Sequence, residues 1–233
     1  MDKNKVILEF DGSQSTILYK DEFLSHDEQI NLINELNTFD MIDYPNSTRK
    51  MYWLDDHNRN YNFSKVKLSG NNFTPVCNLV RNKVNEFMTS NSGESGDMEY
   101  YSSVLITKYP DSHSGLGWHA DNEKYIIENS DIVSISLGCS RDFELRRMTE
   151  NERKWECICT NKPFVHNDNW DQTVYRYKLV SGSLLVMGGS MQKFWYHQVP
   201  KIRRSVYIPP SKNCVRYNLT FRKYNNDLYD SDS

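Results

Sequence analysis

A histidine and an aspartate two positions apart are the first residues that suggest chemistry, in the stretch GWHADNE (117–123). If this stretch enters a strand at Trp118, His119 and Asp121 project to one face, because alternate residues of a strand share a face. The pair is a candidate for metal binding, although a polar surface loop also explains it. Two ligands hold a transition metal poorly, so the prediction of a metal site requires a third ligand.

The six histidines of the chain limit the choice of that third ligand. His197 lies in KFWYHQVP, after the strand-like SLLVMG and among aromatic residues, which indicates an ordered, partly buried position. With His119 and Asp121 it would form a two-histidine, one-carboxylate triad, which suits non-haem iron(II) and leaves positions open for a cosubstrate and dioxygen. Zinc competes for the same ligands. A histidine bonded to the backbone beside an aromatic cluster is the structural alternative for His197.

Two arginines six positions apart lie in the strand-like segment VRYNLTFR (215–222). The even spacing places Arg216, Asn218 and Arg222 on one face, while apolar residues occupy the other. Arginines that face a core are costly unless an anion neutralises them, and a planar guanidinium matches a carboxylate. A dicarboxylate cosubstrate with one end on the metal would satisfy both features. Pairing of the arginines with internal acids is the alternative.

The elements that must position these residues are mostly strands. A capping box at Ser25–Glu28 and the pair Thr74–Pro75 predict the starts of two helices. Alternating segments separated by Gly, Pro and Asn predict strands, at 6–10, 15–20, 102–109, 132–138, 142–146, 155–160, 174–180, 183–188 and 215–222. A long hairpin loop is expected at 161–172. Short strands after two helices predict a β-sandwich or jelly roll buttressed by helices on one side.

Composition indicates a soluble, globular, intracellular protein, with nucleus or cytoplasm left open. The net charge of −3 excludes a global basic field, but the stretch from Lys193 to Lys223 has eight Lys or Arg and no acid, which predicts a local basic face. Five cysteines without a framework spacing predict free thiols. Alternation in a strand explains Cys157-x-Cys159 better than zinc does. We expect no signal peptide and no membrane span.

Several motifs together resemble the AlkB family of iron(II)- and 2-oxoglutarate-dependent dioxygenases. These are HADNE, IVSISLGCSRDF, GSLLVMGG, FWYHQVP and VRYNLTFRK. TRKMYW (48–53) and NYNFSK (60–65) are similar to the nucleotide-recognition segment of its DNA-repair branch. The resemblance implies one α+β, mainly β domain: an N-terminal extension and nucleotide-recognition lid over 1–99 and a double-stranded β-helix core over 100–223. The three aspartates of YNNDLYDSDS predict an acidic, disordered tail over 224–233.

The resemblance also assigns cofactor roles. Iron(II) would be held by His119, Asp121 and His197. The cosubstrate 2-oxoglutarate would lie against Tyr109, Thr107, Arg216, Asn218 and Arg222. Thr107 stands where the family has an asparagine, so one hydrogen bond to the cosubstrate would come from a hydroxyl rather than an amide.

The activity that the resemblance implies is oxidative demethylation of alkylated nucleobases. The bases are of the 1-methyladenine and 3-methylcytosine type, in DNA or RNA, and the products are formaldehyde, succinate and carbon dioxide. We expect a monomer that acts on nucleic acid and not on a membrane. The alternative is a dioxygenase of the same mechanism that acts on a protein, a lipid or a tRNA side group.

Substrate contacts follow from the same resemblance. Tyr61 and Phe63 would lie over a flipped base, and Glu123 would face its exocyclic edge; an alternating strand and a solvated loop acid are the alternatives. Met41 or Ile42 would wedge into the base stack. Basic residues would contact phosphates, with a solvated face as the alternative: Arg49, Lys50, Arg141, Lys201, Arg203 and Arg204.

Overall fold

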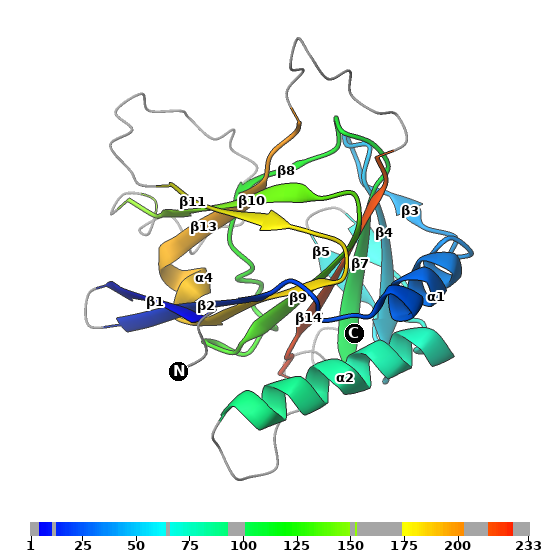
Figure 1. Cartoon of the computed structure of the whole chain (residues 1–233), viewed down its shortest axis with the longest axis horizontal. Helices are drawn as coiled ribbons and strands as arrows, with labels where there is room; N and C mark the ends of the chain where they lie inside the picture. Colours follow the sequence, from blue (N-terminus) through cyan, green and yellow to red (C-terminus); the bar gives the residue numbers. More distant parts are fainter. Residues whose placement is uncertain are drawn as a thin grey trace.

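A computed structural model describes residues 5–10, 13–63, 66–92, 101–149, 152, 174–202 and 214–225 (Figure 1). The helices are α1 (His26–Leu36), α2 (Pro75–Ser92) and α4 (Met191–Phe194). The strands are β1 (Lys5–Phe10), β2 (Ser13–Lys20), β3 (Ile42–Asp43), β4 (Lys50–Asp55), β5 (Tyr61–Phe63), β6 (Val66–Leu68), β7 (Ser103–Tyr109), β8 (Leu116–His119), β9 (Ile132–Gly138), β10 (Arg141–Arg147), β11 (Val174–Leu179), β12 (Ser183–Gly189), β13 (Trp195–Val199) and β14 (Arg216–Arg222).

Some predictions fall outside the described residues. They concern the strand at 155–160, the hairpin loop at 161–172, the phosphate contacts Arg203 and Arg204, and the zinc alternative at Cys157 and Cys159. In the part of the chain that the structure describes, no helix is long and apolar enough to cross a membrane.

Two antiparallel sheets form the body of the molecule (Figure 1). The larger sheet has the strand order β1-β2-β12-β9-β14-β7-β4-β3, and the smaller has the order β11-β10-β13-β8. One apolar cluster joins the sheets and includes Ile132 and Leu185 from the larger and Phe143 and Leu145 from the smaller. This architecture confirms the predicted mainly β, jelly-roll fold.

Helices α1 and α2 cover the outer face of the larger sheet, as predicted (Figure 1). Leu32 and Val84 of the helices share an apolar cluster with Leu219 of β14. The capping box that starts α1 is present, because the Ser25 side chain accepts from Glu28 N and the Glu28 side chain accepts from Ser25 N. Because Leu219 packs against the helices, odd-numbered residues of β14 face the helices, and even-numbered residues face the space between the sheets.

Strands from both sides of residues 99/100 share one sheet. β2 pairs with β12 and β4 pairs with β7, so strands of the N-terminal extension complete the larger sheet. The expected disordered tail starts too early. Tyr224 forms an isolated bridge with Ile126 and packs edge-on against Trp53 at 5.6 Å, with 6% of its surface exposed.

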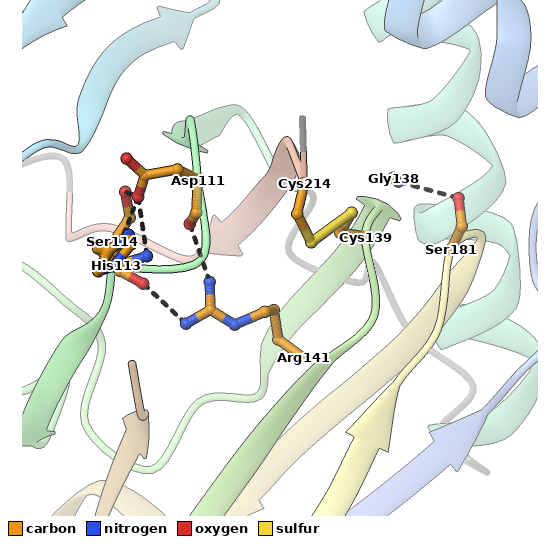
Figure 2. Close-up of a disulfide and its surroundings, with 8 residues drawn as sticks. All are labelled: Asp111, His113, Ser114, Gly138, Cys139, Arg141, Ser181 and Cys214. Atoms are coloured by element: carbon orange, nitrogen blue, oxygen red, sulfur yellow. Dashed lines mark hydrogen bonds between the residues drawn. A yellow bond between two sulfur atoms is a disulfide. The ribbon is translucent and has the colours of Figure 1, made fainter. Parts of the chain in front are cut away.

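Cys139 and Cys214 form a disulfide, with their Cα atoms 5.3 Å apart (Figure 2). The expectation of free thiols is therefore wrong for this pair. Antiparallel pairing of β9 with β14 brings the two cysteines together, and Cys139 N donates to the Val215 carbonyl at 2.9 Å. Gly138 has a φ of 80°, and a Cβ at this position would collide with the same carbonyl. Cys77, in contrast, is a buried free thiol.

Candidate metal centre and cosubstrate pocket

His119, Asp121 and His197 converge between the two sheets. His119 ends β8, and the strand register pairs it directly with His197 in β13. The histidine Nε2 atoms lie 3.6 Å (His119) and 4.0 Å (His197) from Asp121 Oδ1. Each residue offers one ligand atom, and these atoms lie within 4.8 Å of one another. The three predicted ligands are thus close enough to hold one metal ion.

The charge states of these residues suit metal binding. Burial alone would raise the pKa of Asp121, but Arg222 foremost, with both histidines, outweighs it and holds that pKa well below its usual value. Burial, and then His119, lowers the pKa of His197 to about 3. At neutral pH Asp121 is ionised and His197 is neutral, and these are the forms that bind metals. His119 Nδ1 lies 2.8 Å from the Gly117 carbonyl, which orients its ring.

Arg216 is a buried cation with hydrogen-bond donors that could bind an anion. Its side chain is 1% exposed, and Nη2 donates to Ser136 Oγ at 3.0 Å and to Asn218 Oδ1 at 2.7 Å. Its Nε and Nη1 atoms are buried and have no hydrogen-bond partner among the described residues. Burial lowers the pKa of Arg216, and the ring of Tyr109 lies 5.0 Å from the guanidinium. A buried cation with idle donors fits a carboxylate, as 2-oxoglutarate would provide.

The two arginines of β14 differ in their partners. Arg222 pairs with an internal acid, because Nε and Nη2 donate to Asp121 Oδ2 at 3.2 and 2.8 Å. Its Nη1 atom has no hydrogen-bond partner within the described ranges. The alternative of internal pairing therefore holds for Arg222, whereas the hydrogen bonds of Arg216 in the described chain go to neutral oxygens only.

One cavity of about 140 Å³ connects the metal ligands with the arginines. All five residues predicted to contact the cosubstrate lie on its wall: Thr107, Tyr109, Arg216, Asn218 and Arg222. Sequence reasoning missed Ser134 and Thr220, which also line it. The signal was present in IVSISLG, where serines alternate with apolar residues and therefore face inward.

Tyr61 and Glu123 meet at the wall of the same cavity. Tyr61 donates its hydroxyl to Glu123 Oε1 at 2.7 Å, and its ring stacks on Trp53 with centroids 4.7 Å apart. Glu123 Oε2 is buried and has no hydrogen-bond partner in the part of the chain that the structure describes. The structure describes the backbone of Phe63 at the end of β5 but not its side chain.

The predicted basic contacts occupy different environments. Arg49 is 8% exposed, stacks over the Tyr44 ring at 4.5 Å and lines the cavity, so it lies at the pocket rather than on an outer surface. Lys50 is half-buried and pairs with Asp43 at 3.1 Å. Lys201 is exposed at the end of a described segment.

Two residues that were predicted to contact the substrate are buried. Arg141 is 2% exposed, and its Nη2 donates to the Ser114 carbonyl at 2.7 Å (Figure 2) and to the Pro200 carbonyl at 2.6 Å, so it ties two loops together. Met41 is 8% exposed within the cluster under the helices, so of the two alternatives for the wedge only Ile42 stays a prediction. Ile42 beside it is 48% exposed.

Comparisons with known proteins agree with this site. The model of the 2OG-Fe(II) oxygenase superfamily matches residues 17–222. DNA oxidative demethylase ALKBH2 of Homo sapiens is 31% identical over 75% of this chain and 56% of the relative. Alpha-ketoglutarate-dependent dioxygenase alkB homolog 3 of Bos taurus is 31% identical over 70% of this chain and 47% of the relative. The chain thus spans about half the length of these curated relatives.

A solved structure shows the same fold. The structure of OsALKBH1 superposes with a TM-score of 0.55 and 18% identity, and the match covers 89% of this chain and 97% of that one.

Proposed function

We propose that this chain, which belongs to the 2OG-Fe(II) oxygenase superfamily and to its AlkB family, oxidatively demethylates alkylated nucleobases in DNA or RNA. The observation that carries the proposal is the Glu123 carboxylate, which has one buried oxygen without a partner on the wall of the cavity that holds the metal triad. The names of the curated relatives, a DNA oxidative demethylase among them, support the same class of substrate.

In this proposal the three ligands and the arginines hold the reactants. His119, Asp121 and His197 would hold iron(II), and Arg216 with its neighbours would hold a carboxylate of 2-oxoglutarate. Bound iron supplies the oxidation of the methyl C–H bond at the expense of dioxygen and 2-oxoglutarate, with formaldehyde, succinate and carbon dioxide as products. Arg222 keeps Asp121 ionised and oriented.

Glu123 would select bases that carry an exocyclic amino group. Tyr61 already donates to Oε1, so Oε2 is the acceptor that is left for a ligand. A buried carboxylate oxygen without a donor is costly. The amino groups of 1-methyladenine and 3-methylcytosine would supply that donor, whereas a carbonyl at the same place, as in 3-methylthymine, would face a second acceptor.

A panel of methylated oligonucleotides, read by mass spectrometry after incubation with iron(II) and 2-oxoglutarate, tests the proposal. We expect 1-methyladenine and 3-methylcytosine to lose a methyl group faster than 3-methylthymine by roughly tenfold or more, since a site built to accept a donor discriminates strongly against a substrate without one. Parallel DNA and RNA strands distinguish the two polymers. The proposal would be contradicted if the enzyme consumed 2-oxoglutarate with other substrates but demethylated none of the methylated oligonucleotides.

The alternative substrate, a protein, a lipid or a tRNA side group, keeps the same metal chemistry. Two observations favour it: the net charge of −3, and the burial of Arg141 away from any phosphate. Binding of single- and double-stranded oligonucleotides at several salt concentrations separates the two proposals, because phosphate contacts make affinity fall steeply with salt.

A further inference from the structure

The backbone at Asp121 is held by a side chain that the sequence motifs do not include. β8 ends at His119, so Asp121 has left the sheet. Its N–H donates to Gln192 Oε1 at 2.8 Å, while Arg222 holds the far oxygen of its carboxylate. Asp121 is thus fixed from two sides, its side chain by Arg222 and its main chain by Gln192.

Gln192 is close to two of the three candidate metal ligands: it contacts Asp121 in space and precedes His197 in the sequence. It lies in α4, next to Met191, which is 1% exposed in the cluster between the sheets. Its Nε2 atom lies 3.6 Å from Met187 Sδ, and its oxygen is turned to Asp121. Five residues further on, the chain reaches His197 in β13. One short segment therefore carries one candidate ligand and anchors the backbone of another.

A second cavity, of about 450 Å³, lies against the same segment. Asp121 and Glu123 line both this cavity and the one that contains the triad, so the chain between them separates the two spaces. Gln192 lines the second cavity only. Without its side chain, water in the second cavity would reach the Asp121 N–H, and the backbone would lose its protein partner there.

We infer that Gln192 is a positioning residue for the metal centre. Its amide oxygen fixes the backbone at Asp121 and thereby keeps Asp121 Oδ1 beside the Nε2 atoms of the two histidines. Groups that orient metal ligands in this indirect way change metal affinity by about 10–100-fold. The inference concerns metal binding alone, so it does not depend on which substrate the enzyme takes.

Metal titration and amide exchange test the inference on the full chain, without cosubstrate or nucleic acid. Gln192→Met keeps the length and loses the acceptor, Gln192→Glu keeps an acceptor, and Lys193→Met is the matched control on the same helix. We expect Gln192→Met to weaken Mn²⁺ binding in calorimetry by about 10–100-fold and to speed deuterium exchange in the segment 116–123. Gln192→Glu should keep the slow exchange of the wild-type chain, and Lys193→Met should match it in both measurements.

The exchange measurement separates a local role from a general loss of structure. Faster exchange confined to 116–123, with slow exchange retained in β9 and β14, supports the inference. Wild-type Mn²⁺ affinity and exchange in Gln192→Met would overturn it, as would an equal loss of affinity in Lys193→Met. A wild-type chain that binds no Mn²⁺ would overturn the metal centre itself and the inference with it, whereas failure on methylated oligonucleotides would leave both in place.

Discussion

Arg222 donates two hydrogen bonds to one carboxylate oxygen of Asp121, Oδ2, at 3.2 and 2.8 Å. The other oxygen, Oδ1, is the one that lies near both histidine Nε2 atoms. The arginine therefore does more than neutralise a buried charge. It determines which oxygen of Asp121 is left for a metal ion.

Loss of this ion pair should destabilise the metal-free chain. Arg222→Met leaves the Asp121 carboxylate buried without its main cation, and breaking one side of a buried pair costs about 3–5 kcal/mol. The double variant with Asp121→Asn should recover most of that loss, as urea unfolding of the four chains would show. Equal unfolding free energies for wild type and Arg222→Met would contradict the ion pair.

The contribution of Asp121 to the pH dependence of stability should have opposite signs in the wild type and in Arg222→Met. In the wild type, Arg222 holds the folded pKa of Asp121 below its unfolded value, so the pair stabilises above the unfolded pKa and this contribution is lost as pH falls through the folded pKa. In Arg222→Met, burial raises that pKa, so the variant should lose stability as pH rises from about 4 to 7. Thermal melts of both metal-free chains across this range measure the difference.

Arg216 should control cosubstrate binding. Arg216 Nε and Nη1 have no hydrogen-bond partner among the described residues and are therefore available to the cosubstrate. Arg216→Gln should weaken 2-oxoglutarate binding by roughly 100-fold, as expected for the loss of a buried charge-assisted contact. Calorimetric titration with Mn²⁺ present measures the effect. Arg176→Gln is the control, because the Arg176 side chain is 62% exposed on β11. This variant should bind 2-oxoglutarate as tightly as the wild type does.

Thr107 offers a sharper test of the cosubstrate pocket. Thr107→Val keeps the shape and removes only the hydroxyl, so the KM for 2-oxoglutarate should rise by about fivefold, the effect of one neutral hydrogen bond. Thr107→Ser keeps the hydroxyl and should stay near the wild type. If both variants match the wild type, the hydroxyl does not contact the cosubstrate.

The disulfide should stabilise the fold. It closes a loop with a sequence separation of 75, and the loss of chain entropy in the unfolded state corresponds to about 4 kcal/mol. Reduction should lower the melting temperature of the wild type but leave that of Cys139→Ser unchanged. An intact mass that shows no oxidised pair in the wild type would contradict the bond.

Part of the site follows from local sequence rules alone. Side chains of a strand alternate between two faces, so VRYNLTFR places Arg216, Asn218 and Arg222 together whatever the strand pairs with, and the structure puts all three on the cavity wall. Helix capping is equally local, and the box at Ser25 starts α1 as predicted. The AlkB motifs are local as well, because each is a short string of consecutive residues.

Other features depend on which segments become neighbours. Arg141 and Arg49 are both arginines in polar surroundings of the sequence, yet one ties two loops and the other lines the pocket. Met41 was a candidate wedge because FDMIDY (39–44) matches the apolar finger of the family's duplex-repair branch, but helix packing buries it. Cys139 and Cys214 are brought together only by the pairing of β9 with β14.

By itself, then, the amino-acid sequence determined the residue types of the triad, the inward face of β14 and the mainly β class, because these rest on chemistry and on a period of two. The tertiary structure alone decided which oxygen of Asp121 is free, that Gln192 holds its backbone, and that Arg141 is buried. These features rest on contacts between residues 27 to 101 positions apart, and a strand's periodicity carries no information about its distant partners.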